Sequence, residues 1–263
     1  MASDGIKLRA ENIKKYFYTH EGVTVRAIKD VTLDIREGEF VALLGPSGCG
    51  KSTFLFMVAG FEEPTAGKLM LDGEPIKGPS PNRGIVFQEY VLFPWRTVRK
   101  NIEFGLEIQR TDKKERAERC DELIGLVGLK GFEEAYPHTL SGGMQQRVAI
   151  ARALAYDPDL LLMDEPFGAL DAQTRLRLIR DLVRIHEATH KTTMFVTHSV
   201  EEAIGLADRI FLFAARPSYI KEVAEVKIPK PREITSDEFI DLQRTLLKSL
   251  NVEVEKMMKL PGE

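Results

Sequence analysis

The sequence has few of the features that mark secreted, membrane-spanning or metal-binding chains. Only 2 of its 263 residues are cysteines. Cys49 and Cys120 lie far apart and lack metal-ligand spacing, so we expect two reduced thiols, as in a cytosolic chain. No run reaches the roughly 18 apolar residues that a membrane-spanning helix needs. The N-terminal stretch MASDGIKLRAENIKK holds no apolar signal-peptide core, so we expect no secretory signal.

A basic surplus is also missing. The formal net charge is −3, whereas chains that bind nucleic acid usually carry an excess of lysine and arginine. We therefore expect no nucleic-acid partner. The remaining composition, 43% hydrophobic and 29% charged, is typical of a globular protein. Its length allows one large domain or two small ones.

Short apolar runs and amphipathic segments alternate along the chain. The runs predict strands at 7–13, 27–35, 40–44, 69–71, 85–87, 160–163 and 193–197, and the segments predict helices at 51–59, 112–127, 172–189 and 237–259. This order predicts an α/β core with a mostly parallel sheet, interrupted by a helical insert. In the last helix, one face is expected to carry Phe239, Leu242, Leu246 and Leu250.

A glycine-rich stretch, GPSGCGKST, separates two apolar runs at residues 45–53. It matches the phosphate-loop pattern G-x-x-x-x-G-K-[ST] through Gly45, Gly50, Lys51 and Ser52. Glycines let backbone N–H groups curl around phosphates, and the helix that follows points its positive end at them. We expect Lys51 to reach the β- and γ-phosphates of a nucleoside triphosphate, and the Ser52 hydroxyl to bind Mg²⁺.

Three further predicted strands end in polar residues. The stretch LLLMDEP places Asp164 and Glu165 at a strand end, where α/β sheets bind their ligands. Asp164 is expected in the Mg²⁺ shell, and Glu165 is expected to orient or deprotonate the attacking water. Gln88 and His198 also end strands. Either residue alone more often has a structural role. The order of the motifs along the chain, with the loop lysine first, then glutamine, then Asp-Glu and then histidine, favours contact of both residues with the γ-phosphate or its water.

A second glycine cluster, LSGGMQQR, spans residues 140–147 and opens a predicted helix. Ser141 is a good N-cap, and Gly142 and Gly143 bare backbone N–H groups. The cluster has the chemistry of a second anion site, although the chain has one phosphate loop. It could face the phosphate of another copy, or it could be an N-cap that binds nothing.

Together these motifs resemble the ATPase subunit of ATP-binding-cassette (ABC) transporters, over roughly residues 6–228. The family's motifs fall at 45–53 (Walker A), Gln88 (Q-loop), 140–147 (signature), 160–166 (Walker B), 168–171 (D-loop) and His198 (switch histidine). The resemblance implies a RecA-like P-loop NTPase core with an N-terminal antiparallel β subdomain and an inserted α-helical subdomain. The implied division is 1–88 with 157–230 for the core and β subdomain, 89–156 for the helical subdomain, and 231–263 for a helical tail.

In this family two subunits bind head to tail, so that the signature of one closes over ATP held by the other. The resemblance therefore implies a second copy as partner. The implied ATP contacts are Phe17, Gly45, Pro46, Ser47, Gly48, Cys49, Gly50, Lys51, Ser52, Thr53, Ser141, Gly142, Gly143 and Asp171; the implied Mg²⁺ contacts are Ser52, Gln88 and Asp164; the implied catalytic residues are Glu165, His198 and Gln88. Spacing favours Phe17 for stacking on adenine, but Tyr16 and Tyr18 flank it. Gly168 stands where many relatives carry serine.

Because the chain predicts no membrane helix, the permease is expected to be a separate polypeptide, as in bacterial importers. After the Q-loop, Val91, Phe93 and Trp95 suit a groove that receives a short permease helix. The stretches GPSPNRGIVFQ, Pro94-Trp95 and PKPRE resemble the importers of nitrate, sulfonates and taurine. This implies a position on the cytoplasmic face of the plasma (inner) membrane. A periplasmic or lipid-anchored solute-binding protein is an indirect partner, and the solute stays open.

Two other functional hypotheses stay open. A soluble ABC ATPase acting on DNA would separate Lys51 from Ser141 by long coiled coils, whereas here the gap is 141 − 51 = 90 residues without extended heptads. Ribosome-acting relatives carry two cassettes, and this chain shows one. A small-molecule kinase could use the same phosphate loop, but it would not need the signature or His198.

Overall fold

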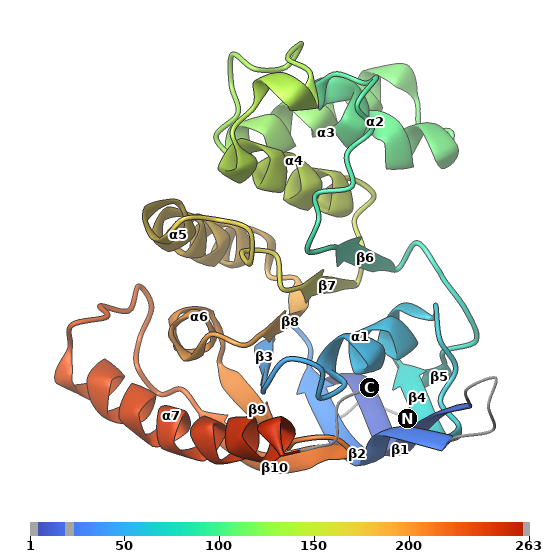
Figure 1. The fold of residues 1–263 in the computed structure, drawn as a ribbon. Helices are drawn as coiled ribbons and strands as arrows, with labels where there is room; N and C mark the ends of the chain where they lie inside the picture. Colours follow the sequence, from blue (N-terminus) through green and yellow to red (C-terminus); the bar gives the residue numbers. More distant parts are fainter. Residues whose placement is uncertain (1–4, 19–23, 260–263) are drawn as a thin grey trace. The chain divides into compact units, whose positions relative to one another are not determined.

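The computed structural model describes residues 5–18 and 24–259 (Figure 1). Contacts divide the chain into two compact units: residues up to 80 together with those from 192 onward, and residues 81–191. Both units contain helices and strands, so the predicted α/β class is confirmed. The division inferred from the motifs, with its helical subdomain at 89–156, stays a prediction.

The first unit is built on one large sheet. Its elements are β1 (Ile6–Tyr18), β2 (Thr24–Arg36), β3 (Phe40–Leu44), α1 (Lys51–Ala59), β4 (Ala66–Leu71), β5 (Glu74–Pro75), β8 (Thr192–Thr197), α6 (Val200–Leu206), β9 (Arg209–Phe213), β10 (Ser218–Glu225) and α7 (Asp237–Met258). The strands follow the order β5-β4-β1-β2-β10-β9-β3-β8. β1 pairs antiparallel with β2 and β4, while β3 pairs parallel with β8 and β9. The unit therefore joins an antiparallel sheet to a parallel core.

The parallel strands are buried because helices cover them. Every residue of β3 and of β8 is buried, and α1 and α6 pack against these strands. Strands covered on both faces read as continuous apolar runs, as FVALL does here. Phe40 and Phe195 pack across the two strands with ring centroids 6.0 Å apart. This contact packs the start of β3 against the middle of β8.

The second unit combines two strands with helices. Its elements are β6 (Arg83–Val86), α2 (Val98–Ile108), α3 (Lys113–Leu126), a 3₁₀ turn (Pro137–Thr139), α4 (Gly142–Ala155), β7 (Leu160–Asp164) and α5 (Ala172–Thr189). β6 and β7 are parallel, with Val86 opposite Met163. The four helices begin after side-chain N-caps, namely Thr97, Asp112, Ser141 and Asp171. Each cap oxygen accepts a backbone N–H that the first helical turn leaves unpaired.

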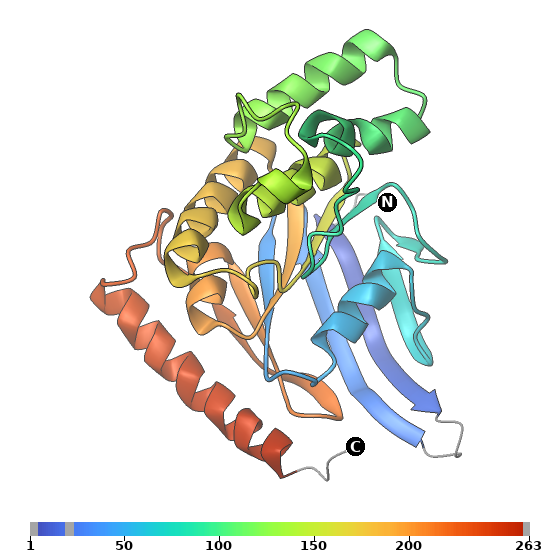
Figure 2. The same ribbon diagram turned by 45° about the horizontal axis from the view of Figure 1, so that its top comes forward.

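The C-terminal helix α7 has 22 residues and lies alongside β9 and β10 (Figures 1 and 2). Phe239, Leu246 and Leu250 are buried as the spacing predicts, and Leu242 is half-buried. Glu253 continues the buried face. Within the described residues, none of the helices is long and apolar enough to cross a membrane.

Candidate functional site

The phosphate loop connects β3 to α1 through two left-handed glycines. Gly48 has φ +75° and Gly50 has φ +107°, a region that residues with a Cβ rarely adopt. Gly50 caps α1 without a side-chain hydrogen bond, so no cap oxygen takes up the helix's first N–H groups. The loop therefore presents backbone donors and the positive end of a helix, which fits the phosphates of a nucleotide.

The loop lysine is folded inward. Lys51 is 3% exposed, and its Nζ donates to the carbonyl oxygens of Gly45 (2.8 Å) and Pro46 (2.9 Å). Two carbonyl oxygens thus hold a buried ammonium group at the N-terminus of α1. A buried cation is costly unless it is hydrogen-bonded, and it gains most from an anion. The geometry fits the phosphate-binding role that the sequence predicts for Lys51.

Gly45 packs closely against the end of β9. A Cβ at this position would lie 3.0 Å from the Cβ and the carbonyl oxygen of Phe213, and 3.1 Å from the Sγ of Cys49. Cys49 itself is 0% exposed. The base of the phosphate loop is therefore seated on the end of β9.

His198 leaves the sheet at the same edge as the phosphate loop. In the parallel pair of β3 and β8, Leu44 lies opposite Thr197, so Gly45 and His198 are the next residues of two adjacent strands. The Thr197 hydroxyl donates to Glu202 Oε2 at 2.6 Å and accepts the backbone N–H of Ser199 at 2.9 Å. These bonds fix the turn that carries the exposed His198. No sequence motif singles out Thr197 or Glu202 as supporting residues.

In the second unit, the acidic strand end and Gln88 also share one edge. Val86 lies opposite Met163, so Gln88 follows the end of β6 on the side of the sheet where Asp164 ends β7 and Glu165 follows it. Asp164 is 8% exposed and ends β7. Glu165 has φ +42°, a left-handed conformation that costs a non-glycine residue about 1–3 kcal/mol and occurs often at active sites.

Gly168 connects the turn of Glu165 to Gln88. Its N–H donates to the carbonyl oxygen of Glu165 at 3.1 Å, and a Cβ at Gly168 would lie 3.4 Å from Nε2 of Gln88. That distance is an ordinary van der Waals contact. Serine would therefore fit at this position, and glycine leaves the Gln88 amide without a side-chain neighbour there.

The signature motif opens α4 as predicted. The Ser141 hydroxyl accepts the N–H of Met144 at 3.3 Å. A Cβ at Gly142 would lie 2.7 Å from the hydroxyl oxygen of Tyr90, and one at Gly143 would lie 2.7 Å from Cγ2 of Thr174. A Cβ at either position would therefore require the neighbouring Tyr90 or Thr174 side chain to shift. Tyr90, two residues after Gln88, is a neighbour of the signature that no sequence motif indicates.

Asp171 caps α5. Its Oδ1 accepts the N–H groups of Gln173 (3.1 Å) and Thr174 (3.0 Å). Hydrogen bonds from Thr174 hold the pKa of this exposed carboxyl below its ordinary value. Its predicted contact with nucleotide stays a prediction beside this structural role.

The aromatic triplet of β1 is solvent-accessible in part. Phe17 is 38% exposed and Tyr18 is 72% exposed. Lys15 Nζ lies 4.9 Å from the ring centroid of Phe17, and the Arg26 guanidinium lies 5.8 Å from that of Tyr16. Side chains alternate along a strand, so Phe17 faces away from its two neighbours. Adenine stacking on Phe17 stays a prediction.

The loop after Gln88 exposes apolar side chains. Trp95 is 71% exposed and Val91 is 55% exposed. Phe93 is half-buried, with its ring centroid 5.7 Å from that of Trp95 and 4.6 Å from that of Phe104. The loop thus presents an exposed tryptophan whose ring packs against Phe93, and Phe93 in turn packs against Phe104.

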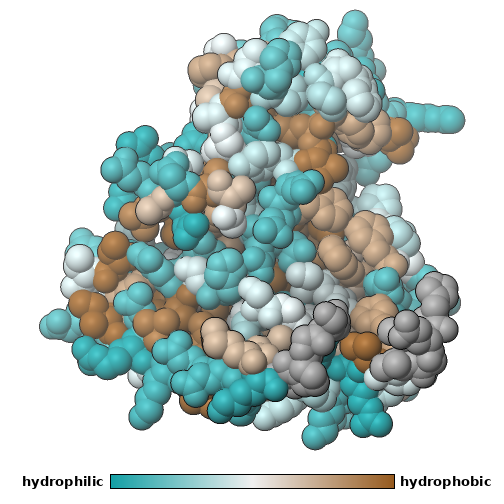
Figure 3. All heavy atoms as spheres, viewed as in Figure 1, coloured by the Kyte–Doolittle hydropathy of each residue, from teal (hydrophilic) through white to brown (hydrophobic). Residues whose placement is uncertain are grey.

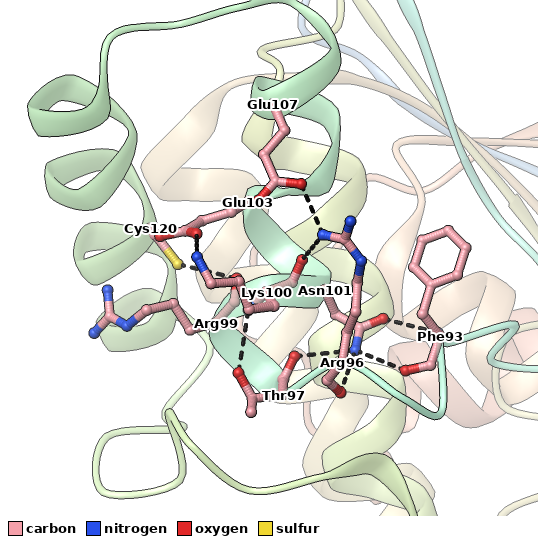
Figure 4. Close-up of polar contacts among 9 residues, drawn as sticks. All are labelled: Phe93, Arg96, Thr97, Arg99, Lys100, Asn101, Glu103, Glu107 and Cys120. Atoms are coloured by element: carbon pink, nitrogen blue, oxygen red, sulfur yellow. Dashed lines mark hydrogen bonds and ion pairs between the residues drawn. The ribbon is translucent and has the colours of Figure 1, made fainter.

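Hydrogen bonds from α2 hold this loop in one conformation (Figure 4). Asn101 is 0% exposed; its Oδ1 accepts the N–H of Phe93 at 2.9 Å, and its Nδ2 donates to carbonyl oxygens of Phe93, Arg96 and Thr97. Arg96 donates to Glu107 at 2.8 Å. A buried amide with four bonds fixes the loop far more firmly than surface contacts do.

Comparison with known proteins agrees with this arrangement of motifs. The family model described as ABC transporter matches residues 28–168. An uncharacterized ABC transporter ATP-binding protein of Methanocaldococcus jannaschii is 51% identical over 97% of this chain and 95% of its own length. A taurine import ATP-binding protein of Pelagibacter ubique is 48% identical over 81% of this chain and 80% of its own length. Import ATP-binding proteins for nitrate and for aliphatic sulfonates match at 44% identity.

A solved structure agrees as well. A dimeric ATP-binding cassette in a post-hydrolysis state, bound to ADP and phosphate, aligns with a TM-score of 0.72 at 33% identity, covering 84% of this chain and 99% of the other. The chain therefore belongs to the ABC transporter family as an ATP-binding subunit, and it is an ATPase. The resemblance to the nitrate, sulfonate and taurine group is confirmed by the relatives.

Proposed function

We propose that this ATPase drives an importer whose permease is a separate polypeptide, and that the solute is a small organic or inorganic compound of the nitrate, sulfonate and taurine kind. The observation that carries the transport role is the hydrogen-bonded loop after Gln88, which displays Trp95 with 71% of its side chain exposed. An exposed tryptophan on a fixed loop suits a helix-in-groove contact. The named import relatives support the solute class.

The residues that hold ATP are proposed from the motifs. The proposed contacts are Phe17 with adenine; Gly45, Pro46, Ser47, Gly48, Cys49, Gly50, Lys51, Ser52 and Thr53 with the phosphates; and Ser141, Gly142, Gly143 and Asp171 from a second copy. The inward position of Lys51 supports the phosphate role. The cap of Ser141, with its bare glycines, supports an anion-facing role for α4.

Hydrolysis is proposed to depend on Glu165, Gln88 and His198. Glu165 orients or deprotonates the attacking water, while Gln88 and His198 contact the γ-phosphate or that water. Mg²⁺, when bound, neutralises charge on the phosphates. Ser52, Gln88 and Asp164 would hold it, and their hydroxyl, amide and carboxylate oxygens are the donors that Mg²⁺ prefers.

The working form is proposed to be a head-to-tail dimer on the cytoplasmic face of the membrane. One chain carries one phosphate loop and one signature, so each ATP would lie between the loop of one copy and the signature of the other. The dimeric state of the cassette with 33% identity supports this assembly. The permease is proposed to contact Val91, Phe93 and Trp95, and a solute-binding protein acts through that permease.

The test is a pull-down from native membranes. The tagged full-length chain is isolated after gentle solubilisation, beside Trp95→Ala as a matched variant. A multi-spanning permease at equal stoichiometry with the wild type, and much less with Trp95→Ala, supports the proposal. Recovery of DNA, of ribosomes or of the lone chain from both samples overturns it.

A further inference from the structure

The last turn of α7 lies beside the phosphate loop. A Cβ placed on Gly48 would be 3.6 Å from the Cε methyl of Met257. The methyl group therefore occupies the space next to a left-handed glycine in the middle of the loop. Nothing in the phosphate-loop motif itself calls for this contact, since Met257 is more than 200 residues downstream (257 − 48 = 209).

The same turn holds the segment that follows β9. The thioether Sδ of Met257 accepts the backbone N–H of Arg216 at 3.3 Å, and Glu253 Oε2 accepts the N–H of Ala215 at 2.9 Å. β9 ends at Phe213, whose backbone and Cβ support Gly45. α7 therefore contacts the loop directly through Gly48 and indirectly through β9 and Gly45.

Glu253 anchors this turn by charge. Its side chain is 1% exposed and lies 2.9 Å from Lys221 Nζ and 2.7 Å from Lys256 Nζ. Burial raises its pKa, but hydrogen bonds from Lys256, the Ala215 N–H and Lys221 outweigh burial and lower the pKa to about 2. The carboxylate is thus ionised at neutral pH, and removing one partner of such a buried pair is costly.

The outer face of α7 carries a mixture of charged and apolar side chains. At the lower left of Figure 3, where Figure 1 shows α7, hydrophilic and hydrophobic residues alternate on the surface. Its exposed apolar residues are Ile240, Leu247, Val252 and Met258, interleaved with charged side chains. The distinctive contacts of the helix are those on its inner side, near Met257.

We propose that α7 is a working part of the nucleotide site, in which Met257 and Glu253 are positioning residues for the phosphate loop. A loop with glycines at positive φ is conformationally free, and ordering it costs entropy when a phosphate binds. The Met257 methyl beside Gly48 and the bonds to Ala215 and Arg216 restrict that freedom before ATP arrives. Preorganised donors bind more tightly because this cost is already met.

The inference rests on the proposed binding of ATP by the phosphate loop, and the experiment separates the two. The full-length protein and the variants Met257→Ala, Met257→Leu and Met258→Ala are compared by ATP dissociation constant, KM, kcat and thermal midpoint. Met258 is the adjacent control, 79% exposed. Lys51→Ala serves as the reference for lost phosphate binding.

We expect Met257→Ala to raise the ATP dissociation constant and KM by roughly threefold to tenfold, with kcat at saturating ATP within about twofold. Met257→Leu restores part of the affinity because it refills the space beside Gly48 but lacks the sulfur acceptor. Met258→Ala stays at the wild-type value. Glu253→Gln is measured as well, because Met257→Ala alone could act by loosening α7. We expect Glu253→Gln also to raise the ATP dissociation constant.

An unchanged or tighter dissociation constant for both Met257→Ala and Glu253→Gln overturns the inference and leaves the proposed function intact. If the wild type and Lys51→Ala bind ATP equally, the phosphate-loop role itself fails. A shift shared by Met258→Ala also overturns the inference, because it assigns the effect to the end of the helix in general.

Discussion

The Nη1 atom of Arg152 donates to the carbonyl oxygen of Val91 over 2.7 Å. Arg152 lies on α4, the helix that the signature opens, and its Nη2 also donates to the carbonyl oxygen of Tyr90 at 3.3 Å. Val91 has φ +46°, an unusual conformation for a β-branched residue. One arginine therefore ties the signature helix to the loop that exposes Trp95.

Replacing Arg152 with methionine should destabilise this unit and weaken the coupling of ATP hydrolysis to transport. The two carbonyl oxygens lose a charged donor, and because Val91 is exposed and water replaces part of that donation, we expect a loss of about 1 kcal/mol in the free energy of unfolding. Denaturant unfolding measures that loss. In membranes with the permease, we expect transport to fall more than basal ATP hydrolysis.

The matched control is Arg180→Met on α5, where the arginine is exposed. It should stay within about 0.5 kcal/mol of the wild type, as surface substitutions usually do. Arg152→Lys is informative as well, because an ammonium group keeps the charge but does not reproduce the planar fork. Equal stability of Arg152→Met and Arg180→Met would contradict the role of this contact.

Trp95→Ala should separate permease binding from the chemistry. The indole is 71% exposed, so its loss should change the free energy of unfolding by no more than about 0.5 kcal/mol. ATP binding by the isolated chain should be unaffected, while assembly with the permease is reduced. Co-purification and ATP titration on the same preparation check both parts. Ile108→Ala, at another exposed apolar position in this unit, is the control and should leave assembly unchanged.

Glu165→Gln should keep ATP binding and abolish turnover. The amide preserves the size of the side chain but removes the carboxylate that acts on water, and general-base catalysis is typically worth about 10² to 10⁴ in rate. The bound state should therefore persist as an ATP-dependent dimer. Size-exclusion chromatography with and without ATP measures the dimer, and phosphate release measures turnover. Hydrolysis at the wild-type rate would refute the assignment.

Glu253→Gln should change how stability depends on acid. The pKa of this carboxyl is lowered from 4.5 to about 2 in the folded protein. A lowered folded-state pKa stabilises the protein above the unfolded value, and that stabilisation is lost as pH falls toward about 2. Between these values the wild type should lose stability more steeply than the variant. Thermal midpoints measured across this pH window check the difference in slope, and equal slopes would show that the lysine contacts do not set the ionisation.

The sequence predicts best where local chemistry dictates structure. The helices at 51–59 and 172–189 have the predicted bounds, because glycine or aspartate marks where each begins. Ser141 caps α4 as expected. The apolar strand FVALL is also where the sequence places it, because complete burial leaves an unbroken hydrophobic run.

Other elements carry weaker signals. β10, SYIKEVAE, mixes charged and apolar residues because it is only partly buried, so its pattern does not stand out. α6 has 7 residues, too few for a helical period to be read. β1 and β2 extend further than the alternating segments indicate, since several register shifts interrupt their pattern.

The sequence does not predict contacts between residues that are far apart along the chain. Motif order predicts that Gln88, Glu165 and His198 follow strands, but not that Tyr90 lies against Gly142 or that Met257 lies beside Gly48. Nothing local distinguishes Met257 from Met258, although the structure separates them by burial. Such pairings depend on how whole elements pack, and no short pattern records them.

Both thiols of the chain are sealed from solvent, since Cys49 and Cys120 are each 0% exposed. Burial also raises the pKa of Cys120 to about 12, so its reactive thiolate form is scarce at neutral pH. We therefore expect the folded protein to react only slowly with bulky maleimide dyes. A single cysteine introduced at an exposed position such as Met258 would then take a fluorophore alone, and its emission could report in real time how the helix end responds to nucleotide.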